Sequence, residues 1–228
     1  GCHGEIVRRA PAAKYLTRFY LLIALGGALG GVFASVIAPL LFETYLELPL
    51  LLIVLAEIMV ALQWRRRGAR AMLWVVRAAM MVGVVALNLV LVAAELRARE
   101  QEVRIERNFY GVLRVRDHFE NDARRRTLMH GTIGHGYQFL DPDYRQAAGA
   151  YYSLGSGVGR VLAAKAQEKT LRVGVIGLGA GVLLTYARSQ DAYAVYEINP
   201  EVVTIAERDF TYLADARARG ASVQILPG

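Results

Sequence analysis

A glycine-rich turn between two apolar segments carries the clearest chemical signal in this sequence. Residues 170–181 read TLRVGVIGLGAG, a β-branched apolar segment that runs directly into Gly177, Gly179 and Gly181. Glycine permits the positive φ angles of a tight turn and lets the backbone approach a ligand closely. A second apolar segment, AYAVYEINP, carries Glu197 twenty residues after Gly177. An acid at the tip of that strand can accept hydrogen bonds from both hydroxyls of a ribose, so the pattern predicts a nucleoside site.

The spacing of the glycines separates two classes of nucleoside ligand. The chain has GxGxG, with Val182 three residues after the second glycine. The dinucleotide fingerprint has glycine or alanine at that position. The spacing therefore favours a ligand of the S-adenosyl type over NAD. A glycine turn that only packs a helix against a strand is the alternative that needs no ligand.

The segments around the turn predict the α/β unit that would position it. VLLTYARSQ follows the glycines with helical spacing, residues 202–218 predict a helix, and ASVQILPG predicts a third strand. Strands that alternate with helices give a parallel βαβαβ arrangement. We therefore predict a Rossmann-like domain of the S-adenosylmethionine-dependent methyltransferase type over 170–228. Because the sequence starts at Gly1 and stops within a strand-to-loop motif, we expect that it is a piece of a longer protein and that this domain is truncated.

A small β-hairpin region is expected before this unit, at 108–140. NFYGVLRVRD alternates apolar and polar positions and predicts a strand, DHFENDARRR predicts a turn, and TLMHGTIGHGYQF predicts the partner strand. Phe109 and Tyr110 could stack on an adenine, although packing in the hairpin core is the favoured interpretation. His130 and His135 are five residues apart, which on one strand places them on opposite faces, so no metal site is expected. A helix is predicted over 158–168.

The first half of the chain has the composition of a membrane segment. The 228 residues are 55% hydrophobic, with a net charge of +7. Three apolar runs, 19–42, 48–64 and 71–94, approach the roughly 20 residues that a helix needs to cross hydrocarbon. Residues 1–94 hold nine basic and four acidic side chains, so +5 of the charge lies beside these runs. That position indicates membrane-flanking charge and no nucleic-acid partner.

The arrangement of charge predicts a topology that conflicts with a cytosolic ligand. By the positive-inside rule, the basic residues before the first run share the cytoplasmic face with RRRGAR at 65–70. Three spans from an inside start would then place the second half outside the cell. Either one run does not cross, or the charge rule fails; the second run, which is short and contains Glu57, is the weakest span. We expect a multi-pass protein of the cell (inner) membrane with a cytoplasmic nucleoside-binding domain, joined by a connector at 95–107.

The order of these motifs resembles a known family. A hairpin, then Tyr151 and Tyr152 with SGVG at 156–159, then VIGLGAG and YEINP, resembles the spermidine-synthase-like domain of membrane-fused polyamine aminopropyltransferases. The apolar half, with HGE at 3–5 before TRFYLLIALGGALGGVF, is similar to the major-facilitator-like membrane part of those proteins. The resemblance implies transfer of an aminopropyl group from decarboxylated S-adenosylmethionine to a diamine such as putrescine, with release of methylthioadenosine.

The resemblance also implies roles for individual residues. Gly177, Gly179 and Gly181 match the nucleoside-binding glycines of the family, and Glu197 matches its ribose-binding acid. The catalytic aspartate and the adenine-contacting aspartate of the family would fall after Gly228. We therefore expect the catalytic residues to lie outside this sequence, and this stretch alone to be inactive.

Two further positions match the family only in part. Gln138, or alternatively His135, lies where the soluble synthases place a glutamine on the nucleoside side. Tyr151 and Tyr152 match the acceptor site, but the His-Glu pair that follows the acceptor-site tyrosine in soluble synthases is absent. Ala180 stands where those synthases have an aspartate near the amine of the donor.

These departures leave three functions open. The first is a membrane-anchored aminopropyltransferase that takes decarboxylated S-adenosylmethionine and a small amine. The second is an S-adenosylmethionine-dependent methyltransferase on the same fold. The third is a transporter or sensor whose domain binds a nucleoside without turnover. The expected partners are the amine substrate, the lipid bilayer and a second copy of the chain in a homodimer, while the identity of the amine stays open.

Overall fold

The computed structural model describes the whole chain except residues 1, 9, 65–70, 101 and 121. It consists of two compact units, Gly1–Arg99 and Glu100–Gly228. The boundary lies within the predicted connector at 95–107. The helix of the last apolar run continues into that connector, and a β-strand begins three residues after the helix ends.

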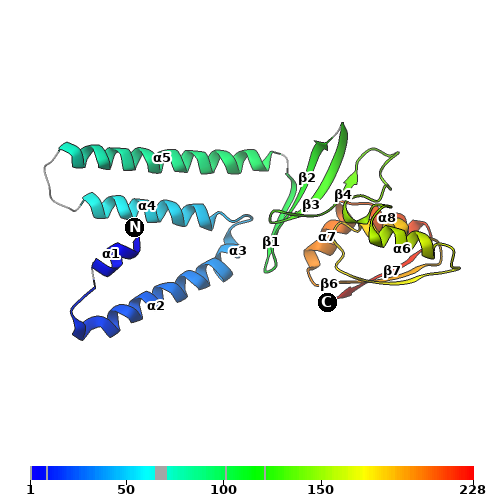
Figure 1. The fold of residues 1–228 in the computed structure, drawn as a ribbon, viewed down its shortest axis with the longest axis horizontal. Helices are drawn as coiled ribbons and strands as arrows, with labels where there is room; N and C mark the ends of the chain where they lie inside the picture. Colours follow the sequence, from blue (N-terminus) through cyan, green and yellow to red (C-terminus); the bar gives the residue numbers. More distant parts are fainter. Residues whose placement is uncertain (1, 9, 65–70, 101, 121) are drawn as a thin grey trace. The chain divides into compact units, whose positions relative to one another are not determined.

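The first unit is helical, and all three predicted apolar runs form helices (Figure 1). In chain order it contains α1 (Cys2–Arg8), η1 (Ala13–Tyr15), α2 (Leu16–Val32), the π-helical stretch η2 (Phe33–Ile37), α3 (Ala38–Leu41), α4 (Glu47–Trp64) and α5 (Ala71–Arg99). The π-helical stretch directly precedes Pro39, whose ring would clash with the preceding turn of a regular α-helix. The wider π-helical turn relieves this clash, so the first apolar run stays helical on both sides of Pro39.

Two helices among the described residues are long and apolar enough to cross a bilayer, Ala13–Leu41 and Trp74–Ala94. They correspond to the first and third predicted spans. The second predicted span forms helix α4 but is not one of these two. The basic run 65–70, on which the predicted topology depends, lies outside the described residues. Most large apolar side chains of α2, α4 and α5 are exposed, as expected of helices that face lipid.

The second unit begins with a four-stranded antiparallel sheet in the order β1-β2-β3-β4. The strands are β1 (Glu102–Asn108), β2 (Gly111–Glu120), β3 (Ala123–His130) and β4 (Ile133–Phe139). The predicted two-stranded hairpin at 108–140 is therefore wrong in extent. Its first strand, β2, also pairs with β1 from the charged connector. The segment predicted as its second strand forms two strands, β3 and β4, joined by a turn. Gly131, at φ +59°, provides the tight turn for that reversal, and its N–H donates to the carbonyl of Val112.

The rest of the unit contains a three-stranded parallel sheet in the order β5-β6-β7. The elements are η3 (Ala150–Tyr152), α6 (Gly157–Lys165), β5 (Arg172–Ile176), η4 (Val182–Tyr186), β6 (Ala192–Glu197), α7 (Pro200–Arg208), α8 (Tyr212–Ala218) and β7 (Ser222–Pro227). The predicted strands and their parallel arrangement are confirmed. The segment after the glycines is a short 3-10 helix, and the single helix predicted over 202–218 is two helices separated by three residues.

That break between α7 and α8 fastens the antiparallel sheet to the parallel one. The side chain of Arg104 on β1 contacts the carboxylate of Asp209 at 2.6 Å, and Arg126 on β3 donates to the Asp209 carbonyl. Gln138 on β4 is fully buried, donates to the hydroxyl of Thr211 at 2.7 Å and accepts from the Thr211 N–H at 3.0 Å. A continuous helix has no free backbone groups for these contacts, so the break gives β1, β3 and β4 their anchor.

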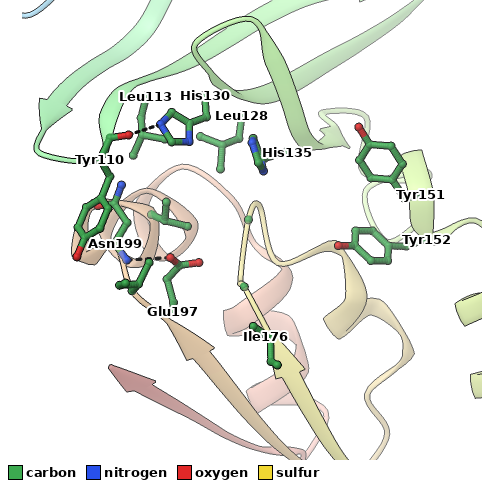
Figure 2. Close-up of a pocket in the computed structure, with 14 residues that line it drawn as sticks. Tyr110, Leu113, Leu128, His130, His135, Tyr151, Tyr152, Ile176, Glu197 and Asn199 are labelled. Atoms are coloured by element: carbon green, nitrogen blue, oxygen red, sulfur yellow. Dashed lines mark hydrogen bonds between the residues drawn. The ribbon is translucent and has the colours of Figure 1, made fainter. Parts of the chain in front are cut away.

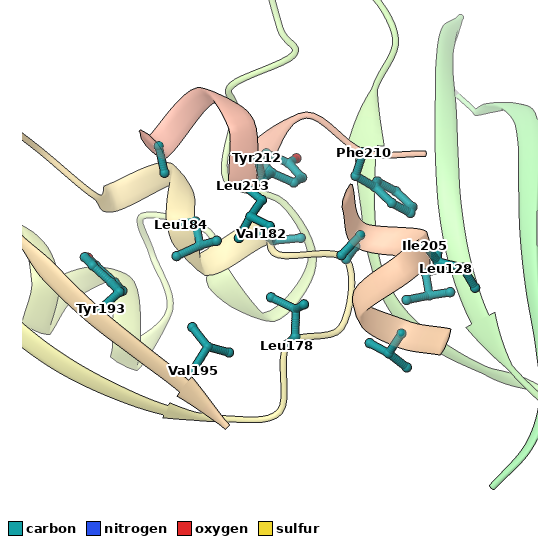
Figure 3. Packing of buried hydrophobic residues seen from close by; sticks show 14 of the residues in the cluster. Leu128, Leu178, Val182, Leu184, Tyr193, Val195, Ile205, Phe210, Tyr212 and Leu213 are labelled. Atoms are coloured by element: carbon teal, nitrogen blue, oxygen red, sulfur yellow. The ribbon is translucent and has the colours of Figure 1, made fainter. Parts of the chain in front are cut away.

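The core of the unit lies between the two sheets and the helices (Figure 3). Its buried side chains come from the antiparallel sheet, the glycine-rich loop, β6 and the helices α7 and α8. Among them, Tyr212 donates through its hydroxyl to the carbonyl of Tyr137 at 3.0 Å, which satisfies a polar atom in an otherwise apolar interior. The core therefore joins both sheets into one packed body.

Strand β4 and the glycine-rich loop touch through their backbones. The N–H of Ala180 donates to the carbonyl of His135 at 3.1 Å. A Cβ at Gly179 would lie 2.7 Å from that carbonyl oxygen, and a Cβ at Gly136 would lie 3.1 Å from the Cβ of Ala180 and 2.9 Å from Val182. Both glycines also have positive φ, at +54° and +115°. No larger residue fits this contact without displacing backbone.

We expect Gly136→Ala to lower the free energy of unfolding by about 1–3 kcal/mol, because it combines backbone strain with overpacking. Gly134→Ala is the matched control on the same strand, since its Cβ would lie 3.7 Å from Met129 and its φ is ordinary. Denaturant unfolding of the detergent-solubilised chain, followed by near-UV circular dichroism, measures both variants. Equal stabilities of the two variants would contradict the close-contact interpretation.

Candidate functional site

A cavity of about 430 Å³ lies at the carboxyl ends of β5 and β6, beneath the antiparallel sheet (Figure 2). Ligands of open parallel sheets bind at this edge, because the loops that follow the strands diverge there. The lining residues are Tyr110, Leu113, Leu128, His130, His135, Tyr151, Tyr152, Ile176, Gly177, Gly179, Glu197, Ile198, Asn199 and Val202. Both halves of the unit therefore contribute walls to the cavity.

Among the described residues that line the cavity, Glu197 is the only carboxylate, and its position is fixed from two sides. One carboxylate oxygen accepts the N–H of Leu178 in the glycine-rich loop at 2.8 Å. The other accepts the N–H of Asn199 at 2.9 Å. An ionised carboxylate has about four acceptor sites, so each oxygen can accept one more hydrogen bond from a ligand. The geometry offers two acceptors, side by side, on a rigid support.

The amides of the glycine-rich loop are largely occupied within the protein. Gly177 donates to the carbonyl of Tyr196 at 2.8 Å, and Gly181 donates to the carbonyl of Leu178 at 3.0 Å. The amides of Leu178 and Ala180 donate to Glu197 and His135, as described above. Of the five amides from Gly177 to Gly181, at most that of Gly179 remains for a ligand. A phosphate site needs several free amides at a helix N-terminus, and here a 3-10 helix follows the loop.

Two histidines face each other in the cavity roof. His130 on β3 and His135 on β4 have ring centroids 5.7 Å apart, and both line the cavity. The prediction that they point to opposite faces is wrong, because a turn separates them and places them on neighbouring strands. Burial, and then the proximity of His130, lower the pKa of His135, while Glu197 acts in the opposite direction. Among the described residues, no group of three or more His, Cys, Asp or Glu side chains could hold a metal ion.

The structure brings together most of the site residues predicted from the sequence. Gly177, Gly179, Glu197, Tyr151 and Tyr152 all line the cavity. Tyr151 is exposed and donates through its hydroxyl to the carbonyl of Gly134 on β4.

Two predicted residues lie elsewhere. Gly181 shapes the end of the loop, where its φ of +82° begins the 3-10 helix, and it does not contact the cavity. Gln138 is committed to Thr211 in the interior, and its alternative, His135, is the residue that reaches the cavity.

Two lining residues, Tyr110 and Asn199, were not predicted as site residues from the sequence. Tyr110 and Phe109 were expected in a hairpin core, yet Phe109 is 91% exposed and Tyr110 lines the cavity. Asn199 caps helix α7 by accepting the N–H of Glu201, and its N–H binds Glu197. An asparagine before a proline that opens a helix is a recognisable cap signal, and it follows the predicted ribose-binding acid by two residues.

Comparison with known proteins adds no assignment to this geometry. No protein-family model matches the chain, and no curated protein matches it.

The lowered pKa of His135 predicts a pH effect on stability. Because the folded chain binds this proton less readily than the unfolded chain, stability falls as the pH drops below about 6.5, the ordinary value for histidine. We expect His135→Gln to lose less stability than the wild type between about pH 7.5 and about pH 5.5. Thermal unfolding followed by near-UV circular dichroism measures this difference. His118→Gln, which changes a histidine of β2 outside the cavity, is the control; equal pH dependence in wild type and His135→Gln would refute the assignment.

Proposed function

We propose that the Glu100–Gly228 unit is a Rossmann-like domain that binds the adenosyl group of decarboxylated S-adenosylmethionine or of S-adenosylmethionine. In this proposal the protein is a membrane-anchored transferase of the polyamine aminopropyltransferase kind. The observation that carries it is the fixed carboxylate of Glu197, which lines a cavity beside Gly177 and Gly179. A ribose offers two adjacent hydroxyl donors, which match the two acceptor positions on this side chain.

The occupied loop amides favour a nucleoside over a nucleotide. A phosphate that replaces its water shell needs several donors, and this loop leaves at most one. The sulfonium group of an S-adenosyl ligand is a cation that needs no such cradle. The domain is therefore suited to a donor without phosphates, in agreement with the GxGxG spacing of the sequence.

In aminopropyl transfer, the amine nitrogen attacks the first carbon of the aminopropyl group, the one bonded to the sulfonium sulfur of the donor. A C–N bond forms, the C–S bond breaks, and methylthioadenosine leaves. Glu197 would hold the ribose, and Tyr151 and Tyr152 would line the side on which the amine enters. An amine that ionises near pH 10 must lose a proton first, so the reaction needs a general base. Among the described lining residues the only carboxylate is Glu197, which this proposal assigns to the ribose, so the base would come from elsewhere.

Two other functions fit the same cavity. A methyltransferase would use the same cavity and give S-adenosylhomocysteine as product. A sensor or transporter would bind the nucleoside and turn nothing over. The products that the full-length protein forms from decarboxylated S-adenosylmethionine with a diamine, and from S-adenosylmethionine, separate these cases.

We also propose that the first unit anchors the protein in the cell (inner) membrane. The support is the pair of apolar helices, Ala13–Leu41 and Trp74–Ala94, each long enough to cross a bilayer. Two crossings return a chain to the side on which it started. If α4 does not cross, an inside start leaves the nucleoside-binding unit in the cytoplasm. The same topology places the basic run 65–70 on the outer side, against the positive-inside rule.

The ribose role of Glu197 predicts the effect of one substitution. We expect Glu197→Ala to weaken methylthioadenosine binding by about 10-fold or more, because hydrogen bonds to a charged group are lost. Isothermal titration calorimetry of the detergent-solubilised chain measures this. Glu168→Ala, which removes an exposed carboxylate paired with Lys165, should bind as the wild type does. Equal affinities for wild type and Glu197→Ala, with an unchanged near-UV spectrum, would defeat the proposal.

The membrane proposal predicts how the protein fractionates. The expressed chain should sediment with membranes and remain there after alkaline carbonate washing, because only detergent releases a bilayer-spanning helix. Recovery of folded chain in the soluble or carbonate-released fraction would show that the apolar helices do not cross a bilayer.

A further inference from the structure

We propose that Tyr110, in the turn between β1 and β2, stacks on the base of the bound nucleoside and so gives the cavity its preference for an aromatic base. The inference deepens the proposed function and rests on it. It assigns a role to the turn Asn108–Gly111, which the ribose site alone does not explain.

The first support is the position of Tyr110. It lines the cavity together with Ile198, Asn199 and Val202, the residues that directly follow Glu197 in the chain. Its side chain is neither buried in the core nor fully exposed, with 39% of its surface accessible. A planar base held beside the ribose-binding acid can therefore reach one face of the Tyr110 ring. Aromatic rings and bases stack without regard to sequence, because every base has a π-face.

The second support is the network that fixes the turn. Asn108 donates through its side-chain amide to the side-chain oxygen of Asn199 at 2.6 Å. The N–H of Tyr110 is held by the side-chain oxygen of Asn108 at 3.0 Å, and the carbonyl of Tyr110 lies 2.7 Å from the imidazole of His130. Asn199 in turn binds Glu197. The backbone that carries Tyr110 is thus linked, through two asparagines, to the carboxylate that would hold the ribose.

The third support is the sidedness of the cavity. In Figure 2, Tyr110 and Asn199 lie on one side of Glu197, and Tyr151 and Tyr152 lie on the other. A ribose held at Glu197 has its base at one end and its sulfur-bearing arm at the other. If the reacting arm extends towards Tyr151 and Tyr152, the base must extend towards Tyr110.

The neighbouring Phe109 supplies a matched control. It is 91% exposed, does not line the cavity and contacts the Tyr110 ring edge-to-face, with centroids 5.5 Å apart. Removing it takes away an aromatic ring of similar size from the same turn without removing a cavity wall.

The experiment is calorimetry on the full detergent-solubilised chain with two probes, methylthioadenosine and methylthioribose, which lacks the base. For Tyr110→Ala we expect affinity for methylthioadenosine to fall about 10-fold, because base stacking on an aromatic ring is lost. Affinity for methylthioribose should stay within about 2-fold, since its contacts are with Glu197. Tyr110→Phe should retain wild-type affinity for both probes, and Phe109→Ala should also bind both as the wild type does.

Each other outcome counts against a specific claim. Wild-type affinity for methylthioadenosine in Tyr110→Ala overturns this inference while leaving the ribose role of Glu197 intact. An equal loss for both probes in Tyr110→Ala shows that the turn matters only for the shape of the site, and likewise overturns it. A base-specific loss in Tyr151→Ala instead reverses the orientation of the ligand. Failure of the wild type to bind either probe defeats the proposed function itself.

Discussion

The backbone contact between β4 and the glycine-rich loop is the constraint on which the second unit depends. The carbonyl of His135 occupies the Ala180 amide, and the contact is close enough to require glycine at both Gly136 and Gly179. It brings the antiparallel sheet over the carboxyl edge of the parallel one, which encloses the cavity. The same contact uses a loop amide that a phosphate would need, so the packing of the fold limits the class of ligand.

Glu197 continues this arrangement on the other side of the loop. By accepting the N–H groups of Leu178 and Asn199, its carboxylate ties β5 to β6 and to the start of α7. Asn199 extends the connection to the first turn of the antiparallel sheet through Asn108. A ribose bound at this acid would therefore contact a group that is already coupled to both halves of the unit. Rigid support of this kind lowers the conformational entropy that the protein must lose when a ligand binds.

The parallel strands and the loop could be predicted because their apolar, β-branched runs are bounded by glycines and by Glu197. The fourth antiparallel strand could not, since β1 (Glu102–Asn108) has charged residues that pair across the sheet and resembles a solvated connector in sequence. The break at Asp209 was hidden because helical periodicity continues across it, and tertiary contacts from Arg104 decide the outcome. His130 and His135 face each other because the turn at Gly131 places β3 beside β4. The sequence predicts one continuous strand there, so it does not reveal this contact. The apolar helices of the first unit could be predicted from the length and apolarity of their runs alone.

We propose that this cavity accepts a nucleoside and that the described loop Gly177–Gly181 offers no cradle for a phosphate. Competition between methylthioadenosine and adenosine 5′-monophosphate on the detergent-solubilised chain tests it most directly, because the two ligands share base and ribose and differ at the 5′ position. We expect methylthioadenosine to bind tighter by about 10-fold or more, since the phosphate loses its water without gaining donors. Tighter binding of the monophosphate would show that the cavity does hold a phosphate.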